Sequence, residues 1–212
     1  IALANELAKI SARLGVNAHD VIELANKHPR VNIHLPGPGV GGHCLAVDPY
    51  FIIEKAREES PLITESRRIN NSMPHFVIEQ VKRMTAELDQ PVIAVCGLTY
   101  KGNIDDVRES PAIEIAEMLL ANERYDVRIH DPHVTEEQVP FKLSSLEEAA
   151  DGANLLVVLV DHNEFKQFDE ALLLEKMATP VIFDTRNCAK IEDERFTVYQ
   201  IGNLKNLKAI QA

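Results

Sequence analysis

The sequence predicts an α/β protein in which a helical segment is followed by a doubly wound, Rossmann-like parallel sheet. Two observations predict this fold. Up to about residue 88, apolar residues recur at helical spacing, and after Asp89 short apolar runs of β type alternate with helical stretches. Strands that alternate with helices are typical of a parallel sheet. We therefore expect a helical region over residues 1–88 and a sheet domain over residues 89–212.

The helical region begins with an amphipathic segment, whose apolar residues share one helical face: Leu3, Leu7, Ile10 and Leu14. Gly15 stands where a glycine commonly ends a helix. A second short helix is expected over residues 20–27. Residues 49–88 are helical again apart from one loop-like break near residues 59–61 and a kink or restart near Pro74.

The sheet domain contains five segments that predict strands: residues 92–96, a short apolar run, and residues 125–130, 154–160, 180–183 and 197–201. Ser110 and Pro111 are a good N-cap and first residue for the helix after the first strand. Further helical stretches cover residues 145–150 and 170–177. In such a sheet, ligands bind at the carboxyl ends of the strands, so the loops after the first, third and fourth strands should converge on a ligand.

The overall composition is that of an ordinary globular protein, with 212 residues, 45% of them hydrophobic, and a formal charge of −11. The longest apolar run, residues 155–160, is far below the roughly 20 residues that span a bilayer, and no signal peptide is recognisable. The negative charge argues against nucleic acid or anionic lipid as partners. The three cysteines lack paired spacing, which fits a reducing cytoplasm. We expect a cytoplasmic protein that binds small molecules or other subunits.

The most informative segment is the Gly/Pro-rich stretch of residues 36–50. It places Cys44 directly after a run of glycines and prolines, and Asp48 four residues later. Glycine permits positive φ and close backbone approach, while proline stiffens the turns. A free thiol is mostly protonated near neutral pH, so a nucleophilic cysteine needs backbone donors or a cation nearby. The loop N–H groups can provide such donors, which makes Cys44 a candidate nucleophile.

Three other interpretations of this loop are weaker. Residues 37–42 formally match G-x-G-x-x-G, but a dinucleotide-binding turn needs a strand before it and a helix at its end. A structural loop with a buried cysteine is the ordinary alternative for a lone cysteine. A metal site is disfavoured because His43, Cys44 and Asp48 lack the spacing of a zinc set. Four glycines, a histidine, a cysteine and a carboxylate together favour the nucleophile.

Three segments, in order, resemble the UDP-glucose/GDP-mannose dehydrogenase family: residues 41–49, residues 96–111 and residues 182–187. Members of this family use NAD to oxidise the 6-hydroxymethyl group of a nucleotide sugar twice, to a carboxylate. G-G-H-C followed by A-V-D-P-Y-F is most similar to members that act on UDP-N-acetyl-D-mannosamine. UDP-N-acetylglucosamine and UDP-glucose are alternative substrates. A non-catalytic module for UDP-sugar binding or dimerisation is a further alternative.

The resemblance implies a role for each matching residue. Cys44 would attack the aldehyde made by the first oxidation, giving a thiohemiacetal that a second hydride transfer to NAD turns into a thioester. Asp48 would help to activate the hydrolytic water. Arg30 corresponds roughly to a family arginine that reaches a neighbouring subunit's active site. The remaining residues would bind the nucleotide sugar: Gly39, Gly41, Gly42, His43, Tyr100, Lys101 and Arg186.

Several of these residues also have simple structural interpretations. Lys101 alone could be a solvated charge, and His43 could only pack the loop. The arginines could form local ion pairs, Arg108 with Asp106 and Arg186 with Asp184. We take the two other cysteines, Cys96 and Cys188, as core or near-core thiols.

The resemblance also implies what this sequence does not carry. The family's NAD-binding domain precedes the matching region, and so do its catalytic lysine and asparagine, which are expected on the long helix just upstream of Ile1. The sequence contains no strand followed by G-x-G-x-x-G and an acidic residue. We therefore expect NAD to be bound mainly outside these residues and the isolated chain to be inactive. Because the family dimerises through its central helices, we expect a homodimer.

Overall fold

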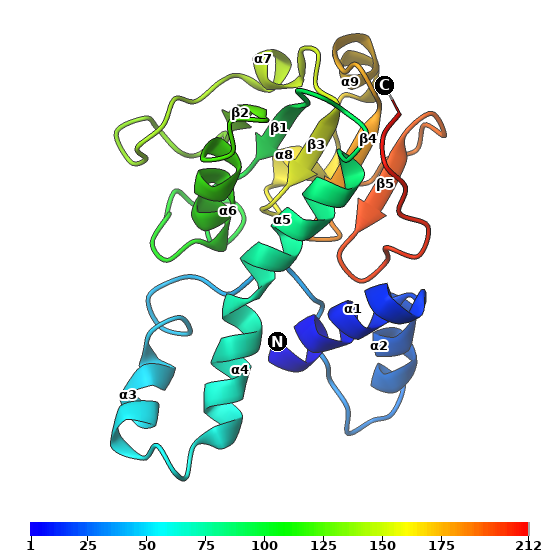
Figure 1. Ribbon diagram of the computed structural model, residues 1–212. Helices are drawn as coiled ribbons and strands as arrows, with labels where there is room; N and C mark the ends of the chain where they lie inside the picture. The colour runs from blue at the N-terminus through cyan, green and yellow to red at the C-terminus, as the bar shows by residue number, and fades with distance from the viewer. Residues whose placement is uncertain (212) are drawn as a thin grey trace.

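The computed structural model describes residues 1–211, with a helical part drawn at the bottom of Figure 1 and a sheet at the top. The elements in chain order are α1 (Ala2–Leu14), α2 (Ala18–Asn26), α3 (Asp48–Lys55), α4 (Pro61–Asn71), α5 (Met73–Met84), β1 (Val92–Cys96), α6 (Pro111–Leu120), β2 (Asp126–His130), α7 (Leu146–Ala150), β3 (Leu155–Val158), α8 (Asn163–Lys166), α9 (Glu170–Lys176), β4 (Val181–Asp184) and β5 (Thr197–Gln200). Each of the five predicted strands is present, with both ends within two residues of the expected bounds. Among the helices of the described chain, none is long and apolar enough to cross a membrane.

The sheet is parallel throughout, with the strand order β2-β1-β3-β4-β5. β1 is the first strand of the sheet. β2 pairs with one edge of β1, and the chain then crosses back so that β3, β4 and β5 follow in order from the other edge. Val95 of β1 pairs with Ile129 of β2 and with Val157 of β3. This order confirms the predicted doubly wound sheet and puts its switch point between β1 and β3, where ligands of such folds bind.

Helices cover both faces of the sheet, and the side chains of each strand alternate between them. Ile93 and Val95 of β1 pack with α5 and α6, while Ala94 and Cys96 face the layer of α7, α8 and α9. This alternation follows from the two-residue period of a strand. Burial of each large apolar side chain contributes about 1.5–3 kcal/mol, so this double core is the main source of stability.

α5 connects the two parts of the molecule. It follows α4 almost directly and runs from the helical part up to the sheet (Figure 1). Its buried face, which includes Val77 and Val81, belongs to the same core cluster as Ile93 and Phe183. Along the chain α5 precedes the predicted boundary at residue 88, yet it packs with the sheet.

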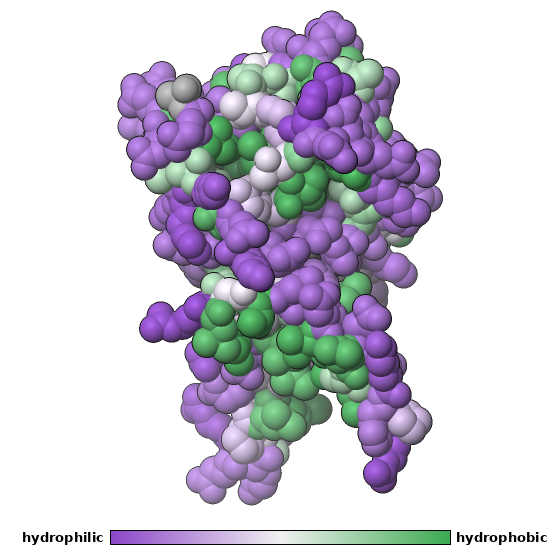
Figure 2. All heavy atoms as spheres, turned by 90° about the vertical axis from the view of Figure 1, so that its right-hand side faces the viewer, coloured by the Kyte–Doolittle hydropathy of each residue, from purple (hydrophilic) through white to green (hydrophobic). Residues whose placement is uncertain are grey.

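α1 turns its large apolar residues outward. Its buried residues are small or polar (Ala4, Asn5, Ala8 and Ser11), whereas Leu3 is 54% and Leu14 is 68% exposed. Figure 2 shows apolar surface gathered over the lower, helical part of the molecule. The predicted C-cap is confirmed, because Gly15 adopts φ 69° and ends the helix. α2 begins two residues earlier than expected because the Asn17 side chain caps it through the N–H of His19.

Candidate functional site

The loop that carries Cys44 packs directly against the loop that follows β1. The N–H of Gly42 donates to the carbonyl oxygen of Arg108 at 3.1 Å. A Cβ atom on Gly41 would lie 2.4 Å from the carbonyl oxygen of Glu109 and 2.7 Å from the Cβ of Tyr100. Only a glycine fits at such a distance, because real Cβ contacts are longer. The two segments singled out by sequence therefore form one site.

The other glycines of the loop are constrained in the same way. A Cβ on Gly39 would lie 2.9 Å from the Pro111 ring, and one on Gly42 would lie 2.9 Å from the ring of Tyr100. Both glycines also have positive φ, 142° and 85°. The sequence predicted that these glycines contact a sugar and its oxyanion. The structure gives them another role, close packing of two loops, and the sugar contact stays a prediction.

This packing leaves a cavity of about 300 Å³ between the loops. Its lining includes five residues predicted from the sequence: Gly39, Gly41, Tyr100, Lys101 and Arg186. Lys101 is exposed, and Arg186 is partly buried. Two cations beside an aromatic ring and closely packed backbone suit a ligand that combines negative charge with a flat or apolar part.

Arg186 is held in two ways at the end of β4. Its backbone N–H donates to Oδ1 of the buried Asp184 at 2.9 Å, and its guanidinium forms an ion pair with Asp161 at 3.1 Å. The predicted pairing of the Arg186 side chain with Asp184 is thus replaced by one with Asp161. Burial opposes ionisation of Asp161, but the charge of Arg186 and the hydrogen bonds to the carboxylate together outweigh it and lower the pKa of that carboxyl.

Cys44 lies in the turn that opens α3, outside the lining of the cavity. Its carbonyl oxygen accepts the N–H groups of Val47 and Asp48, the latter at 2.8 Å. The Cys44 side chain is exposed, as are His43 and Asp48. The predicted nucleophile and carboxylate are therefore one helical turn apart and open to an incoming group.

Arg108, whose carbonyl oxygen accepts the N–H of Gly42, has its side chain paired within its own loop. Its Nη2 lies 2.5 Å from Oδ2 of Asp106, which confirms the local ion pair considered from the sequence. Hydrogen bonds from Arg108 lower the pKa of Asp106 to about 2.

The three cysteines differ sharply in environment. Cys96 is fully buried in the core, and this burial raises its pKa. Burial and the charge of Asp184 raise the pKa of Cys188 to about 12. These two thiols are core or near-core groups, as predicted, and only Cys44 is exposed. Because the thiolate is the reactive form, Cys44 is the thiol of the three whose environment best permits reaction.

Arg67 of α4 is a residue that sequence reasoning missed. It is 8% exposed, and its guanidinium donates to the carbonyl oxygen of Leu45 at 3.1 Å and to Oδ1 of Asn71 at 2.6 Å. It also lies over the ring of Tyr50, 5.5 Å from the centroid. Arg67 thus fixes the residue directly after Cys44. No pattern in the sequence distinguishes it from an exposed helical arginine.

Arg30 is not brought to these residues within one chain. It is exposed after α2, its N–H donates to Nδ1 of His28 at 3.3 Å, and it lines neither the cavity described above nor a second one of about 410 Å³ beside Arg67. A role for Arg30 at a neighbouring subunit stays a prediction.

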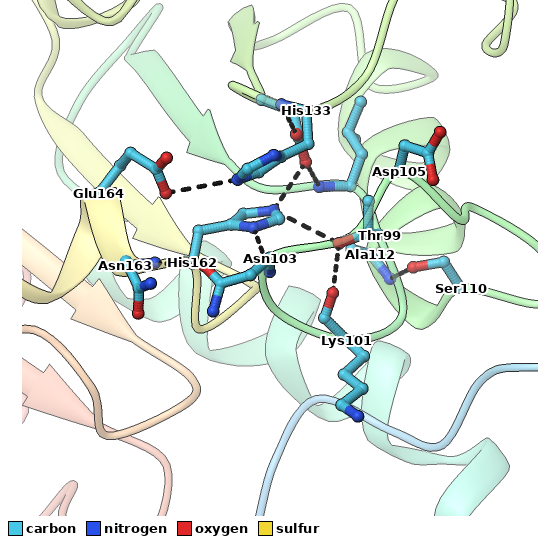
Figure 3. A network of polar contacts seen from close by, with 12 residues as sticks. Thr99, Lys101, Asn103, Asp105, Ser110, Ala112, His133, His162, Asn163 and Glu164 are labelled. Carbon is cyan, nitrogen blue, oxygen red and sulfur yellow. Dashed lines mark hydrogen bonds and ion pairs between the residues drawn. The ribbon is translucent and has the colours of Figure 1, made fainter.

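A buried polar network at the carboxyl ends of β1, β2 and β3 was also missed (Figure 3). Asp131 accepts the N–H of Leu98 at 2.7 Å and lies 3.2 Å from Nε2 of His162. Nδ1 of His162 in turn accepts the N–H of Asn103 at 2.9 Å. These contacts confirm that the loops after the first and third strands converge, since residues far apart in sequence meet here.

The glycine loop lacks the context of a dinucleotide-binding turn. Residues 31–47 contain neither helix nor strand, and residues 37–42 pack against Tyr100 and Pro111. The glycines of the G-x-G-x-x-G pattern are therefore accounted for by the close packing of the two loops, and a dinucleotide is not needed to explain them.

Comparison with known proteins agrees with this geometry. Two models of one family match the chain: the UDP-glucose/GDP-mannose dehydrogenase family, central domain, over residues 1–72, and the same family's UDP binding domain over residues 94–191. Together they cover most of the chain.

Curated relatives and solved structures give the same result. The chain is similar to a UDP-N-acetyl-D-mannosamine dehydrogenase of Methanocaldococcus jannaschii, with 45% identity over 97% of this chain and 48% of the relative. It is 44% identical to an NDP-N-acetyl-D-galactosaminuronic acid dehydrogenase of Ralstonia solanacearum, over 88% of this chain and 44% of that protein. The structure of a UDP-N-acetyl-mannosamine dehydrogenase from Staphylococcus aureus superimposes with a TM-score of 0.85 and 48% identity, covering 98% of this chain and 48% of that one. This chain spans about half the length of the curated relatives it matches.

Proposed function

This chain belongs to the UDP-glucose/GDP-mannose dehydrogenase family, and we propose that it forms part of an NAD-dependent enzyme that oxidises C6 of UDP-N-acetyl-D-mannosamine to a carboxylate. The product would serve as a precursor of surface polysaccharide. One observation carries the proposal: the loop of Cys44 packs on the loop of Lys101 and encloses a cavity with two cations. The similar Methanocaldococcus and Staphylococcus proteins are UDP-N-acetyl-mannosamine dehydrogenases, which supports the choice of sugar.

The cavity is the proposed site for the UDP part of the substrate. A diphosphate needs cations and directional N–H donors, and the cavity lining includes Lys101, Arg186 and glycines of the Cys44 loop. Tyr100 adds an aromatic surface against which a flat base can pack. His43, Gly41 and Gly42 then lie on the side toward Cys44, where the sugar would extend.

Cys44 is the proposed nucleophile. Once C6 has been oxidised to an aldehyde, the Cys44 thiolate adds to the carbonyl carbon and forms a thiohemiacetal, which keeps the aldehyde bound. Loss of a second hydride from C6 leaves a thioester. Water, activated by Asp48, attacks the thioester carbon, and the C–S bond breaks to give the carboxylate and the free thiol. NAD, when bound, accepts one hydride in each oxidation.

NAD and the second subunit are proposed to complete the site. We infer that NAD is held mainly by a part of the protein outside these 212 residues. The exposed leucines of α1 and α2, among them Leu14 and Leu24, are suited to a homodimer interface, and Arg30 would reach the neighbouring subunit's site. The 212-residue chain alone is expected to bind UDP without reducing NAD. The whole protein is expected to act in the cytoplasm.

The test is to compare the complete protein with its Cys44→Ser variant. Wild-type protein should reduce NAD when given UDP-N-acetyl-D-mannosamine, with two NADH formed per carboxylate. Cys44→Ser should lower formation of the carboxylate by on the order of 10³-fold or more while UDP affinity stays within about twofold. The kcat/KM values for UDP-N-acetylglucosamine and UDP-glucose distinguish the alternative substrates.

Alkylation provides a second, activity-independent test. Iodoacetamide should label Cys44 but neither Cys96 nor Cys188, because burial raises the pKa of both of the latter. UDP-N-acetyl-D-mannosamine should slow the labelling. Labelling that the UDP-sugar does not affect, with normal UDP binding and no NAD reduction, would favour a non-catalytic binding module.

A further inference from the structure

We propose that two adjacent residues after β3, Asp161 and His162, position both cations of the nucleotide site: Asp161 orients Arg186, and His162 fixes the loop that presents Lys101. The inference rests on the proposed function, because it names the residues that shape the diphosphate site. Neither residue lines the cavity. Both would therefore act as positioning residues.

The hydrogen bonds of His162 define its tautomer. The ring is fully buried, and its Nδ1 accepts the N–H of Asn103 at 2.9 Å. Nδ1 therefore carries no proton, and Nε2 is the donor. Nε2 lies 3.2 Å from Oδ2 of Asp131 and 3.3 Å from Oγ1 of Thr99. Asp131 is the acceptor that stabilises this tautomer.

The Lys101 loop is attached to the end of β3 on both sides of Lys101. On the N-terminal side of Lys101, the Thr99 hydroxyl donates to the carbonyl oxygen of Lys101 at 2.8 Å and contacts His162. After it, Asn103 adopts a left-handed φ of 61°, donates its N–H to His162 and accepts the N–H of Asn163 at 2.8 Å. Such a φ is unfavourable for a non-glycine residue and persists only where the surroundings enforce it.

Gly102 adds a close contact to the same strand end. A Cβ at this position would lie 2.4 Å from the carbonyl oxygen of Asp161. Figure 3 shows the side chain of Lys101 directed away from His162 and the network around it. The backbone of Lys101 is therefore fixed by the network, and its ammonium group is left free for a ligand.

Asp161 performs the corresponding function for Arg186. Its Oδ1 lies 3.1 Å from Nη2 of Arg186, and both side chains are partly buried. Arg186 has several rotatable bonds, so this ion pair restricts the direction of its guanidinium toward the cavity. Preorganisation of this kind increases affinity by reducing the ordering that binding requires.

A metal-binding role for the histidines is the competing interpretation. His133, His162 and Glu164 offer ligand atoms within 4.8 Å of one another. His162 would have to give up one of the hydrogen bonds described above to bind an ion, because both of its nitrogens are in use. The hydrogen bonds account for His162 without a metal.

The experiment uses the complete protein and UDP as the probe, with the dissociation constant measured by calorimetry. His162→Asn can place its amide oxygen near the position of Nδ1 and keep the bond to Asn103, whereas His162→Gln places its amide near Nε2 and loses that bond. We expect UDP to bind about tenfold more weakly to His162→Gln and within about threefold of wild type to His162→Asn. Asp161→Asn should also weaken UDP binding several-fold. Glu164→Gln is the control, because the Glu164 side chain pairs with His133 and, among the described residues, forms no hydrogen bond to the Lys101 loop; this variant should bind UDP like the wild type.

Hydrogen exchange of the peptide over residues 99–105 provides a direct readout of the loop. Exchange should be faster in His162→Gln than in His162→Asn. If both variants lose UDP affinity equally and in step with their melting temperatures, or if neither changes, His162 has only a structural role and the inference is wrong. Unchanged UDP affinity in Asp161→Asn would overturn the part that concerns Arg186. A wild-type protein that does not bind UDP would instead contradict the proposed function from which the inference starts.

Discussion

The sheet region and the helical region differ in how they place their large apolar side chains. In the sheet region, the strands bury residues such as Ile93 and Phe183 completely, and buried polar residues tie the loops together. In the helical region, α1 and α2 keep large apolar side chains in solvent, with Leu14 68% and Leu24 64% exposed. The sheet region thus buries most of its large apolar side chains within one chain, whereas the helical region leaves many of them exposed.

The difference lies in what each element packs against. A parallel sheet is covered by helices on both faces, so the three central strands, β1, β3 and β4, bury nearly all of their residues. α1 instead packs Ala4 and Ala8 inward, and these small residues let it lie close to α4. An apolar stripe therefore marks the core in one region and the outer surface in the other.

The largest effect should come from a matched pair of truncations, one in each region. Phe183→Ala removes a fully buried ring and should lower the free energy of unfolding by about 3–5 kcal/mol. Leu62→Ala, at a residue that is 79% exposed in α4, should change it by less than about 0.5 kcal/mol. Urea unfolding measures both. Similar values for the two variants would contradict the contrast between the regions.

The pH dependence of stability should reveal the polar network of the sheet region. Burial opposes ionisation of Asp131, but hydrogen bonds from His162 and from the N–H groups of His133 and Leu98 hold its pKa below the ordinary value. A carboxyl with a lowered pKa adds stability above its unfolded pKa of about 3.9, and this stability is lost as the pH falls toward the folded pKa.

Asp131→Asn should therefore lower the free energy of unfolding by about 1–3 kcal/mol at pH 7. It should also flatten the decline in stability below about pH 5. The exposed Asp105→Asn is the control and should keep the wild-type profile. Urea midpoints measured between pH 7 and pH 3 provide the comparison. If the stability of Asp131→Asn declined with falling pH as steeply as that of the wild type, Asp131 would not contribute to the pH dependence.

A smaller effect is expected where the two regions meet. Gly41→Ala places a methyl group 2.4 Å from the carbonyl oxygen of Glu109, so the Cys44 loop must move away from the loop of Lys101. UDP affinity, measured by calorimetry, should fall about tenfold. Gly15→Ala strains a positive φ in open space and should cost about 1 kcal/mol of stability without affecting UDP. Normal UDP binding by Gly41→Ala would show that the loop packing does not shape the site.

Sequence reasoning was most successful where the signal is local. The central strands β1, β3 and β4 are short apolar runs, and the N-cap of α6 is visible as Ser110 followed by Pro111. The segments around Cys44 and Lys101 were found as motifs, and the structure places them in contact. α8 was missed because it is only Asn163–Lys166, too short for any periodicity to appear.

Residues that act through distant partners gave no signal. His162 bonds to Asn103 and Asp131, which are 59 and 31 residues away along the chain. A single buried histidine has no pattern around it, and its partners are defined only by the strand order. The packing role of Gly41 was missed for the same reason, since Glu109 and Tyr100 approach it from another loop.

One buried amide in α1 connects the outer surface of the molecule to the wall of the cavity. Asn5 is fully buried, donates to Oδ1 of Asn70 in α4 at 3.0 Å, and accepts the N–H of Gly37 at 2.9 Å. A Cβ on Gly37 would lie only 3.1 Å from Nη1 of Arg186. The opposite side of the same helix, roughly 20 Å long, carries the exposed leucines. Because α1 carries both the leucines and Asn5, a shift of this helix would change the distance between Gly37 and Arg186.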